Sequence, residues 1–420
     1  MKKFLHMSDV HLGNQQYNLP DRFNDFGEAY FTAIDCAVEE RVEFVLICGD
    51  LFDKAKIDPL TLIQAVEGLK RLQANGIKAL AISGNHDRSH YQDGSSWLNF
   101  LVEQQLLMLF SPEYKDDGAR LMPWDGRSGS YVDIGGVRVY GLPYLGASTG
   151  PMMEDLPRLM AGQKAAGIYF TILMGHFGLE GQLPGASGGL PPHALAGLHE
   201  MVDYLALGHW HKPYEQDGWI FNPGSLECCG MDERSWKGGF YLVSVPERSG
   251  ETLSTRHIEI NRRLFHRIVF PVEGYNSPGE LYEAVNTALA DEKKQLGRQD
   301  KSPIIELVLE GILPFDRQML DLNAVQQSMQ EIFDPLLLAK VVNNTRSTRF
   351  DISPSEYLPR AELEQHILRE LILSDTRFSP QIDHWLAATL EVKELANMKS
   401  DPETIIKILR KVVENSGKEA

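Results

Sequence analysis

The chain has 420 residues, of which 43% are hydrophobic and 24% charged, values typical of a globular protein with two or three domains. Its net charge of −17 excludes a generic nucleic-acid coat protein, although bound metal ions can still neutralise phosphates locally. No apolar run approaches the roughly 18 residues of a membrane span, and the start of the chain resembles a strand more than a signal peptide. Four cysteines are too few for a disulfide framework. We therefore expect a cytoplasmic protein without a membrane segment.

The first 82 residues alternate between short apolar runs and helical patterns. Strands are predicted at residues 3–7, 44–48 and 78–82, and helices at residues 26–41 and 59–75. The run FVLIC at residues 44–48 is apolar throughout, which is typical of a strand buried on both faces. This βαβαβ order indicates right-handed crossovers and a largely parallel sheet.

The next part of the chain is predicted to mix helix and strand. The apolar segment Ser96–Phe110 indicates a helix, and Val132–Leu142 indicates a hairpin that turns at Gly135-Gly136. Further strands are predicted at residues 169–174, 204–207, 219–222, 239–245 and 255–260.

A change of pattern near residue 261 divides the chain into three predicted domains. Residues 1–260 form the first and largest domain. Residues 261–350 alternate strand and helix, as in a small separate α/β unit. Residues 351–420 are helical only, with Pro380 and Pro402 placed where helices begin.

Polar side chains follow five of the predicted strands at the point where each strand ends. They are Asp9 and His11, Asp50 and Asp53, Asn85 and His86, His176, and His209 and His211. Each histidine alone is better explained as an ordinary core or surface residue. Five coincidences of one kind indicate a shared site, because sites in α/β sheets form at the carboxyl ends of the strands.

The chemistry of these side chains favours a metal centre. Imidazole, carboxylate and amide oxygen, without thiolate, suit Mn²⁺, Fe²⁺ or Zn²⁺. The set is large enough for two ions. Two ions about 3.5–4 Å apart that share a carboxylate are suited to in-line attack at phosphorus. Asp50, at the end of a central strand, is the candidate for the shared ligand.

The motifs DVH, GDLFD, GNHD, GHF and GHWH, taken in this order, resemble the signature of the calcineurin-like metallophosphoesterases. Within that superfamily, the opening DVHLG, the GDLFD block and the downstream domains are most similar to the SbcD-type DNA-repair exonucleases. The resemblance covers about residues 1–225. It implies an α/β fold, namely a metallophosphoesterase β-sandwich flanked by helices and followed by a small α/β capping domain and a C-terminal helical segment.

The resemblance also implies a role for each residue that matches a motif. One ion would be bound by Asp9, His11, Asp50 and His211, and the other by Asp50, Asn85, His176 and His209. His86 would lie over the leaving group as a general acid or a stabiliser of transition-state charge. Asp53 would orient His86. The ions would be two divalent cations, Mn²⁺ foremost, with Fe²⁺ or Zn²⁺ as alternatives.

The partners implied by the resemblance are DNA, an SMC-like ABC ATPase of the SbcC type, and a second copy of the chain. The predicted activity is a metal-dependent DNA exonuclease or endonuclease in double-strand-break repair. Two alternatives stay open at this point. One is a phosphodiesterase that acts on small substrates such as cyclic nucleotides, and the other is a scaffold that binds metal without catalysis. A capping domain and a helical tail favour the nuclease, because a small substrate needs neither.

Several other residues near the motifs are predicted to have no role in the site. Asp87 is interpreted as a loop carboxylate. Arg22 and Arg88 are interpreted as solvated surface arginines, with contact to DNA phosphates as the alternative. The adjacent cysteines Cys228 and Cys229 are given no function.

Overall fold

The computed structural model describes residues 2–89, 95–116, 118–163, 166–183, 185, 187–246, 252–347, 360–373, 378, 381–398 and 401–416. The chain divides into two compact units. The first comprises residues 1–266 and 299–304, and the second comprises residues 267–298 and 305–420. The finer division at residue 350 stays a prediction. Among the helices of the described residues, none is both long and apolar enough to cross a membrane.

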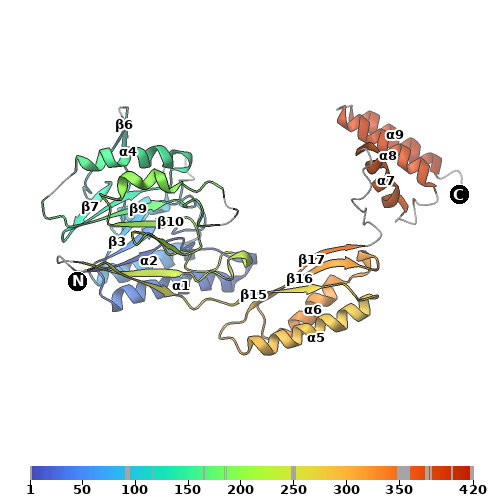
Figure 1. The fold of residues 1–420 in the computed structure, drawn as a ribbon, viewed down its shortest axis with the longest axis horizontal. Coiled ribbons are helices and arrows are strands. Elements are labelled where there is room, and N and C mark those ends of the chain that lie inside the picture. Colours follow the sequence, from blue (N-terminus) through green and yellow to red (C-terminus); the bar gives the residue numbers. More distant parts are fainter. Residues whose placement is uncertain are drawn as a thin grey trace. The chain divides into compact units, whose positions relative to one another are not determined.

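Two six-stranded sheets form the centre of the first unit (Figure 1). The strand order of one sheet is β14 (Ser254–Glu259), β13 (Gly239–Val245), β1 (Lys2–Met7), β2 (Phe44–Cys48), β3 (Lys78–Ile82) and β4 (Met108–Leu109). The order of the other is β11 (Tyr214–Gln216), β12 (Ile220–Asn222), β10 (Tyr204–Gly208), β9 (Phe170–His176), β8 (Val137–Leu142) and β7 (Tyr131–Ile134). Strands β1 to β4 are parallel, whereas β13 joins β1 in antiparallel register.

Alternation of side chains along each strand produces three layers of core. In β2, Phe44 and Leu46 face the second sheet, whereas Val45 and Ile47 face the helices. Both faces are therefore buried, which explains the uninterrupted apolar sequence of this strand.

Helices cover the outer face of each sheet (Figure 1). On one side are α1 (Pro20–Glu39), α2 (Pro59–Ala74) and α3 (Trp97–Glu103), and on the other are α4 (Thr149–Ala161) and the 3₁₀ helix Pro192–Leu198. A small hairpin of β5 (Glu113–Lys115) and β6 (Gly118–Arg120) lies outside both sheets. The predicted α/β architecture, a sandwich of two sheets flanked by helices, is therefore confirmed.

The predicted helix over Ser96–Phe110 is wrong in its second half, because α3 ends at Glu103. Gln105 adopts a left-handed φ of 58°, and the N–H of Leu106 donates to the carbonyl of Leu101. Together with the bond from Gln105 N–H to the Val102 carbonyl, these contacts form a Schellman cap. The apolar pattern continues beyond the cap because Met108–Leu109 then enters the sheet as β4.

The predicted start of the first helix, residue 26, is also wrong. Helix α1 begins at Pro20, which occupies its first turn. Proline is favoured there because its fixed φ is already helical and its missing N–H would have no partner inside the helix.

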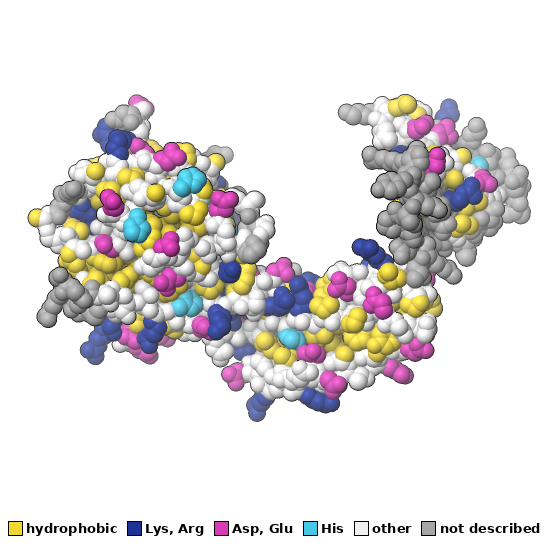
Figure 2. All heavy atoms as spheres, in the orientation of Figure 1, with side chains coloured by type: hydrophobic (Ala, Val, Ile, Leu, Met, Phe, Trp, Pro, Cys, Tyr) yellow, Lys and Arg dark blue, Asp and Glu magenta, His cyan; other side chains and the backbone are white. Residues whose placement is uncertain are grey.

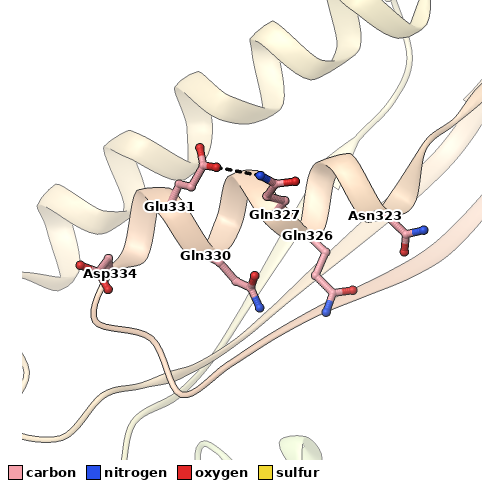
Figure 3. A pocket seen from close by; sticks show the side chains of 6 residues that line it. All are labelled: Asn323, Gln326, Gln327, Gln330, Glu331 and Asp334. Atoms are coloured by element: carbon pink, nitrogen blue, oxygen red, sulfur yellow. Dashed lines mark hydrogen bonds between the residues drawn. The ribbon is translucent and has the colours of Figure 1, made fainter.

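The second unit contains a three-stranded sheet and two helices that share one core. The strand order is β15 (Phe265–Pro271), β16 (Ile304–Leu313) and β17 (Leu338–Ser347), and the helices are α5 (Pro278–Leu296) and α6 (Leu322–Phe333). Helix α6 buries Val325 and Met329 against this core. Its outer side carries amides that line an open polar hollow, where Gln327 donates to Glu331 at 3.0 Å (Figure 3).

Three helices follow in the same unit: α7 (Arg360–Leu373), α8 (Ile382–Asn397) and α9 (Pro402–Ser416). Their order matches the predicted C-terminal helical segment. The predicted helix starter Pro380 lies outside the described residues, whereas Pro402 is the first residue of α9.

His6 is a buried polar residue that joins the two sheets of the first unit. Its Nδ1 lies 2.9 Å from the hydroxyl of Tyr204, and its Nε2 lies 2.9 Å from the carbonyl of Leu207. Because a carbonyl only accepts, Nε2 carries the proton and Nδ1 accepts from Tyr204. Burial lowers the pKa of His6 from 6.5 to about 3, so the ring stays neutral at physiological pH.

This buried histidine predicts acid sensitivity of the first unit. Between pH 6.5 and pH 3 the unfolded chain binds a proton at His6 that the folded chain rejects, so stability is lost as the pH falls through this window. From pH 7 to pH 5 the loss attributable to His6 is about 2 kcal/mol. His6→Gln keeps a donor and an acceptor without titrating. Urea unfolding at both pH values should show a smaller pH dependence for the variant, and equal dependence would contradict the assignment.

Candidate metal centre

The candidate site lies where the carboxyl ends of strands from both sheets meet. Backbone strain is concentrated there, because Asp9, His11, Asp50 and His209 have φ values of 51°, 50°, 53° and 91°. Residues other than glycine rarely adopt this left-handed conformation, and it persists only where the surrounding structure enforces it. These left-handed backbone conformations turn the loops so that the four side chains lie together at one edge of the sandwich.

Two glycines allow the loops to approach one another closely. A Cβ atom on Gly49 would lie 2.1 Å from Nδ1 of His176, and Gly49 has a left-handed φ of 90°. A Cβ atom on Gly84 would lie 2.0 Å from Oδ1 of Asp50. Both distances are far below van der Waals contact, so glycine is required at both positions.

Asn85, His176 and His209 converge with Asp50 in one half of the site. The side-chain oxygen of Asn85 lies 3.2 Å from Nε2 of His176 and 3.0 Å from Nδ1 of His209. Nε2 of His176 is also 3.3 Å from Oδ2 of Asp50. Because Nδ1 of His176 donates to the carbonyl of Cys48 at 2.7 Å, its Nε2 is the atom directed at the oxygen ligands.

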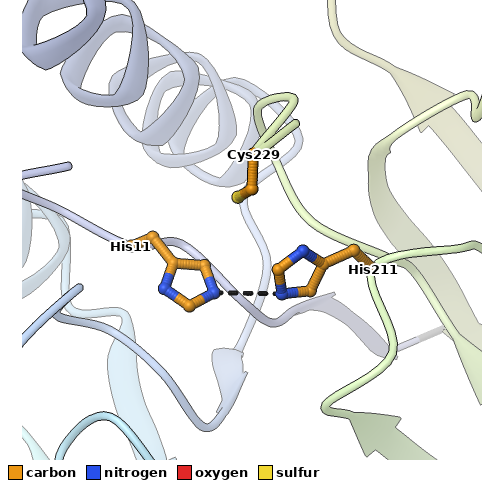
Figure 4. Close-up of side chains that lie close together, drawn as sticks. All are labelled: His11, His211 and Cys229. Atoms are coloured by element: carbon orange, nitrogen blue, oxygen red, sulfur yellow. Dashed lines mark hydrogen bonds between the residues drawn. The ribbon is translucent and has the colours of Figure 1, made fainter. Parts of the chain in front are cut away.

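His11, His211 and Asp9 converge in the other half of the site. The two Nε2 atoms of His11 and His211 lie 3.1 Å apart (Figure 4). Nε2 of His211 is 3.7 Å from Oδ1 of Asp9. The Asp9 carboxylate also accepts from the backbone N–H of His209 at 3.1–3.2 Å, which links the two halves.

Asp53 and His86 lie together beside these ligands, but not through the contact that we had expected. Nδ1 of His86 donates to the backbone carbonyl of Asp53 at 2.7 Å. The carboxylate of Asp53 is instead directed toward His11, with 3.7 Å between Oδ1 and Nδ1. His86 is exposed, and its backbone N–H donates to Oδ1 of Asp50 at 2.8 Å.

Charge and burial act in opposite directions on these groups. Burial opposes the charged form of His176, but its hydrogen bond to the Asp50 carboxylate outweighs burial and raises its pKa to about 9. Burial would raise the pKa of Asp50, yet the contact with His176 holds that pKa well below its usual range. Burial and the neighbouring His211 lower the pKa of His11. Asp50 is therefore an ionised carboxylate paired with a protonated His176 in the metal-free site, and the ring must release its Nε2 proton before that nitrogen can bind a cation.

Asp87, which we had interpreted as an ordinary loop carboxylate, braces the two loops behind the site. It is only 4% exposed and accepts from the backbone N–H groups of Leu51, Phe52 and Gly84 at 3.0–3.3 Å. Burial and the nearby Asp50 charge raise its pKa to about 6. The carboxylate thereby ties the loop after β2 to the loop after β3.

The interpretation of Arg22 as a surface residue or a DNA contact is wrong, because the side chain is fully buried. It binds Asp25 at 2.6 Å, Glu227 at 3.2 Å and the carbonyl of Cys228 at 2.7 Å. A buried guanidinium needs such partners, and here they anchor the 227–229 loop to α1. Arg88 is exposed and stacks over the ring of Tyr144 at 4.8 Å.

Two residues near the site had not been predicted. Oε1 of Glu233 lies 2.7 Å from Nδ1 of His211, and Cys229 lies beside His11 and His211. Cys229 and Glu233 lie only 18 and 22 residues after His211, but the strand-end pattern could not identify them because neither directly follows a strand as the other site residues do.

The residues that the structure brings together fit divalent metal ions. The ligand atoms of Asp9, Asp50 and His176 lie within 4.8 Å of one another. Nδ1 of His11 is a buried polar atom without a hydrogen-bond partner. So many nitrogen and oxygen ligands in one place are better explained as a site for Mn²⁺, Fe²⁺ or Zn²⁺ than as a structural cluster of ion pairs. The fold and the site together define a metal-dependent phosphoesterase class.

Comparison with known proteins gives the family. The model of the calcineurin-like phosphoesterase family matches residues 2–213. The DNA double-strand break repair protein Mre11 of Aeropyrum pernix is 27% identical over 332 residues, 76% of this chain and 75% of that protein. Mre11 of Saccharolobus solfataricus is 24% identical over 420 residues, 98% of this chain and 99% of that protein. The calcineurin-like phosphoesterase YfkN from Bacillus subtilis matches in structure with a TM-score of 0.39 and 14% identity, covering 61% of this chain and 88% of that one.

Because the family model covers half of the chain, the chain belongs to the calcineurin-like phosphoesterase family. The resemblance seen in the sequence motifs is thereby confirmed. The protein is therefore a metal-dependent hydrolase.

The close approach at Gly84 predicts a specific loss of metal binding. Gly84→Ala would force the Asp50 carboxylate to move, because the added Cβ would clash with its Oδ1. We expect Mn²⁺ affinity to fall by about 10-fold or more, as for other changes that misplace a ligand. Isothermal titration with Mn²⁺ measures this. Gly279→Ala, which adds a Cβ in open space, is the control, and equal affinities in the two variants would contradict the prediction.

Proposed function

We propose that this protein is a metal-dependent nuclease that hydrolyses phosphodiester bonds of DNA in double-strand-break repair. The observation that carries the proposal is the pair of ligand clusters that meet at Asp50 beside an exposed histidine, His86. The names of the relatives from Aeropyrum pernix and Saccharolobus solfataricus support DNA as the substrate. The absence of a membrane-crossing helix among the described residues is consistent with a role in the cytoplasm.

The two metal positions are assigned to the two halves of the site. We propose that Asp9, His11, Asp50 and His211 bind one ion, and that Asp50, Asn85, His176 and His209 bind the other. When bound, such ions supply Lewis-acid activation of water and neutralise charge on the phosphate. Mn²⁺ is our first choice of metal, because carboxylate and amide oxygens form a large part of this ligand set.

The protein side chains supply orientation and proton transfer. The Glu233 carboxylate and the Cys48 carbonyl accept hydrogen bonds from Nδ1–H of His211 and His176, respectively, which directs Nε2 of each ring into the site. The Asp53 carbonyl accepts a hydrogen bond from Nδ1 of His86, and in its imidazolium form the ring can then donate its second proton, on Nε2, to the leaving oxygen. Asp53 therefore acts on His86 through its backbone, whereas its carboxylate lies 3.7 Å from Nδ1 of His11 without a hydrogen bond to it.

Two substitutions separate proton transfer from metal binding. His86→Ala removes the proposed acid without removing a ligand, so we expect unchanged Mn²⁺ binding and a fall in kcat of about 10²–10⁴-fold. Asp50→Ala should abolish binding of both ions. The measurements are Mn²⁺ titration and hydrolysis of linear double-stranded DNA. Full activity of the His86 variant would refute the assignment of the acid.

The choice of substrate is tested with the same protein. Purified enzyme with Mn²⁺ is given linear double-stranded DNA, bis-p-nitrophenyl phosphate and cyclic nucleotides in parallel. We expect cleavage of DNA. Hydrolysis of the small esters alone would refute the nuclease and favour a phosphodiesterase of small substrates, and no hydrolysis of any substrate would favour a scaffold.

Exposed apolar side chains, which appear on the surface of both units in Figure 2, support two protein partners. In α2 and α3, Leu60, Ile63 and Phe100 are 63%, 49% and 38% exposed, and we propose that this face forms a homodimer. In α9, Ile406 and Leu409 are 48% and 43% exposed, and we propose that they dock on an SMC-like ABC ATPase of the SbcC type.

Reciprocal variants test both partner surfaces. Ile406→Glu with Leu409→Glu should abolish co-elution with an SbcC-type ATPase and leave a dimeric mass by light scattering. Ile63→Glu with Phe100→Glu should give a monomer that still binds the ATPase. Each double variant is expected to keep the interaction that the other loses, and the retained interaction shows that the variant is folded. A monomeric wild-type protein, or an α9 variant that still co-elutes, would overturn the corresponding surface.

A further inference from the structure

Cys229 lies at the half of the metal centre that contains two histidines. His11, His211 and Cys229 each offer one ligand atom, and these atoms lie within 4.8 Å of one another. The two Nε2 atoms are 3.1 Å apart. Adjacent nitrogen ligands that are each about 2.0–2.1 Å from one ion lie roughly 2.9–3.4 Å from each other. The spacing of the two histidines therefore fits a single shared ion.

The carboxylate of Glu233 fixes the orientation of both His211 and Cys229. Its Oε1 lies 2.7 Å from Nδ1 of His211, and its Oε2 accepts from the backbone N–H of Cys229 at 2.7 Å. A histidine that donates its outer ring proton to a carboxylate presents an unprotonated nitrogen to a metal. Figure 4 shows the sulfur of Cys229 directed toward the two rings. Cys229 is thus held beside two histidines by a carboxylate that also orients one of them, whereas an isolated cysteine has no such neighbours.

The loop that carries Cys229 is held in place from several sides. Gln16 donates to the carbonyl of Cys229 at 2.7 Å, and Arg22 donates to the carbonyl of Cys228 at 2.7 Å. The adjacent thiol of Cys228 points elsewhere, because it donates to the carbonyl of Gly230 at 3.0 Å. The thiol of Cys229 lies 3.7 Å from the carbonyl of Glu227 and also contacts the side chain of His211. A ligand positioned in this way loses little conformational freedom when it binds an ion.

We propose that Cys229 is a sulfur ligand of the ion bound by His11 and His211. The inference rests on the metal centre of the proposed function. On coordination the sulfur forms a bond to the ion, and the thiol proton is released to solvent. A thiolate is a soft ligand, so this half of the centre should favour Zn²⁺ or Fe²⁺ over Mn²⁺. The half formed by Asn85, His176 and His209 lacks sulfur, and the two halves would therefore differ in metal preference.

The experiment is a titration of the full-length, metal-free protein with Co²⁺, followed by absorption spectroscopy. A sulfur ligand gives a thiolate-to-cobalt charge-transfer band in the near ultraviolet, separate from the visible ligand-field bands of any bound Co²⁺. We expect this charge-transfer band in the wild type and in Cys228→Ser, and its loss in Cys229→Ser. Zn²⁺ affinity should fall about 10–100-fold in Cys229→Ser, whereas Mn²⁺ affinity changes by less.

The outcomes separate this proposal from that of the metal centre. Ligand-field bands in all three proteins without any charge-transfer band would overturn the role of Cys229 and leave the centre intact. No cobalt bands in any protein would overturn both. If Cys229→Ser fails to fold, alkylation of the wild type with iodoacetamide replaces it. Zn²⁺ should then slow the alkylation of Cys229 but not that of Cys36, which is half-buried and lies outside the site. Equal alkylation of Cys229 with and without Zn²⁺ would refute the proposal.

Discussion

The face-to-face packing of the two sheets is the constraint on which the candidate metal centre depends. Phe4 stacks on Phe44 within one sheet and meets Tyr204 of the other sheet edge-on, with 5.1 Å between the latter ring centroids. His6 adds polar contacts across the same layer. This layer fixes the spacing between the ends of β1 to β3 and the ends of β9 and β10. The ligands come from both sets of strands, so neither sheet could form the site alone.

The loops at these ends combine strain with bracing. Left-handed backbone at Asp9 and Asp50, and the glycine required at Gly84, are unfavourable for folding when considered alone. Asp87 stabilises the arrangement by accepting three backbone N–H groups from two loops. Strain that is held in this way keeps the ligands in position before any ion binds, which reduces the free-energy cost of ordering them. The geometry of the site is thus a property of the fold.

A second layer of contacts gives each site residue its orientation. The Cys48 carbonyl and the Glu233 carboxylate fix His176 and His211, and the Asp53 carbonyl fixes His86. The buried guanidinium of Arg22 holds the loop that carries Cys229. These contacts hold the exposed ring of His86 beside the buried side chains of Asp9 and Asp50. They also explain why this half of the site contains a thiol that the family motifs do not include.

The sequence alone determined the buried strands, because an uninterrupted apolar run such as Phe44–Cys48 has few other stable placements. It also determined which polar residues follow each strand, and the structure brings all of these residues together. Tertiary structure decided the place of Cys229 beside His11 and the burial of Arg22 against the loop at residues 227–229. Local patterns specify burial and turns over a few residues. Contacts across 200 residues depend on how two sheets pack, which no local pattern encodes.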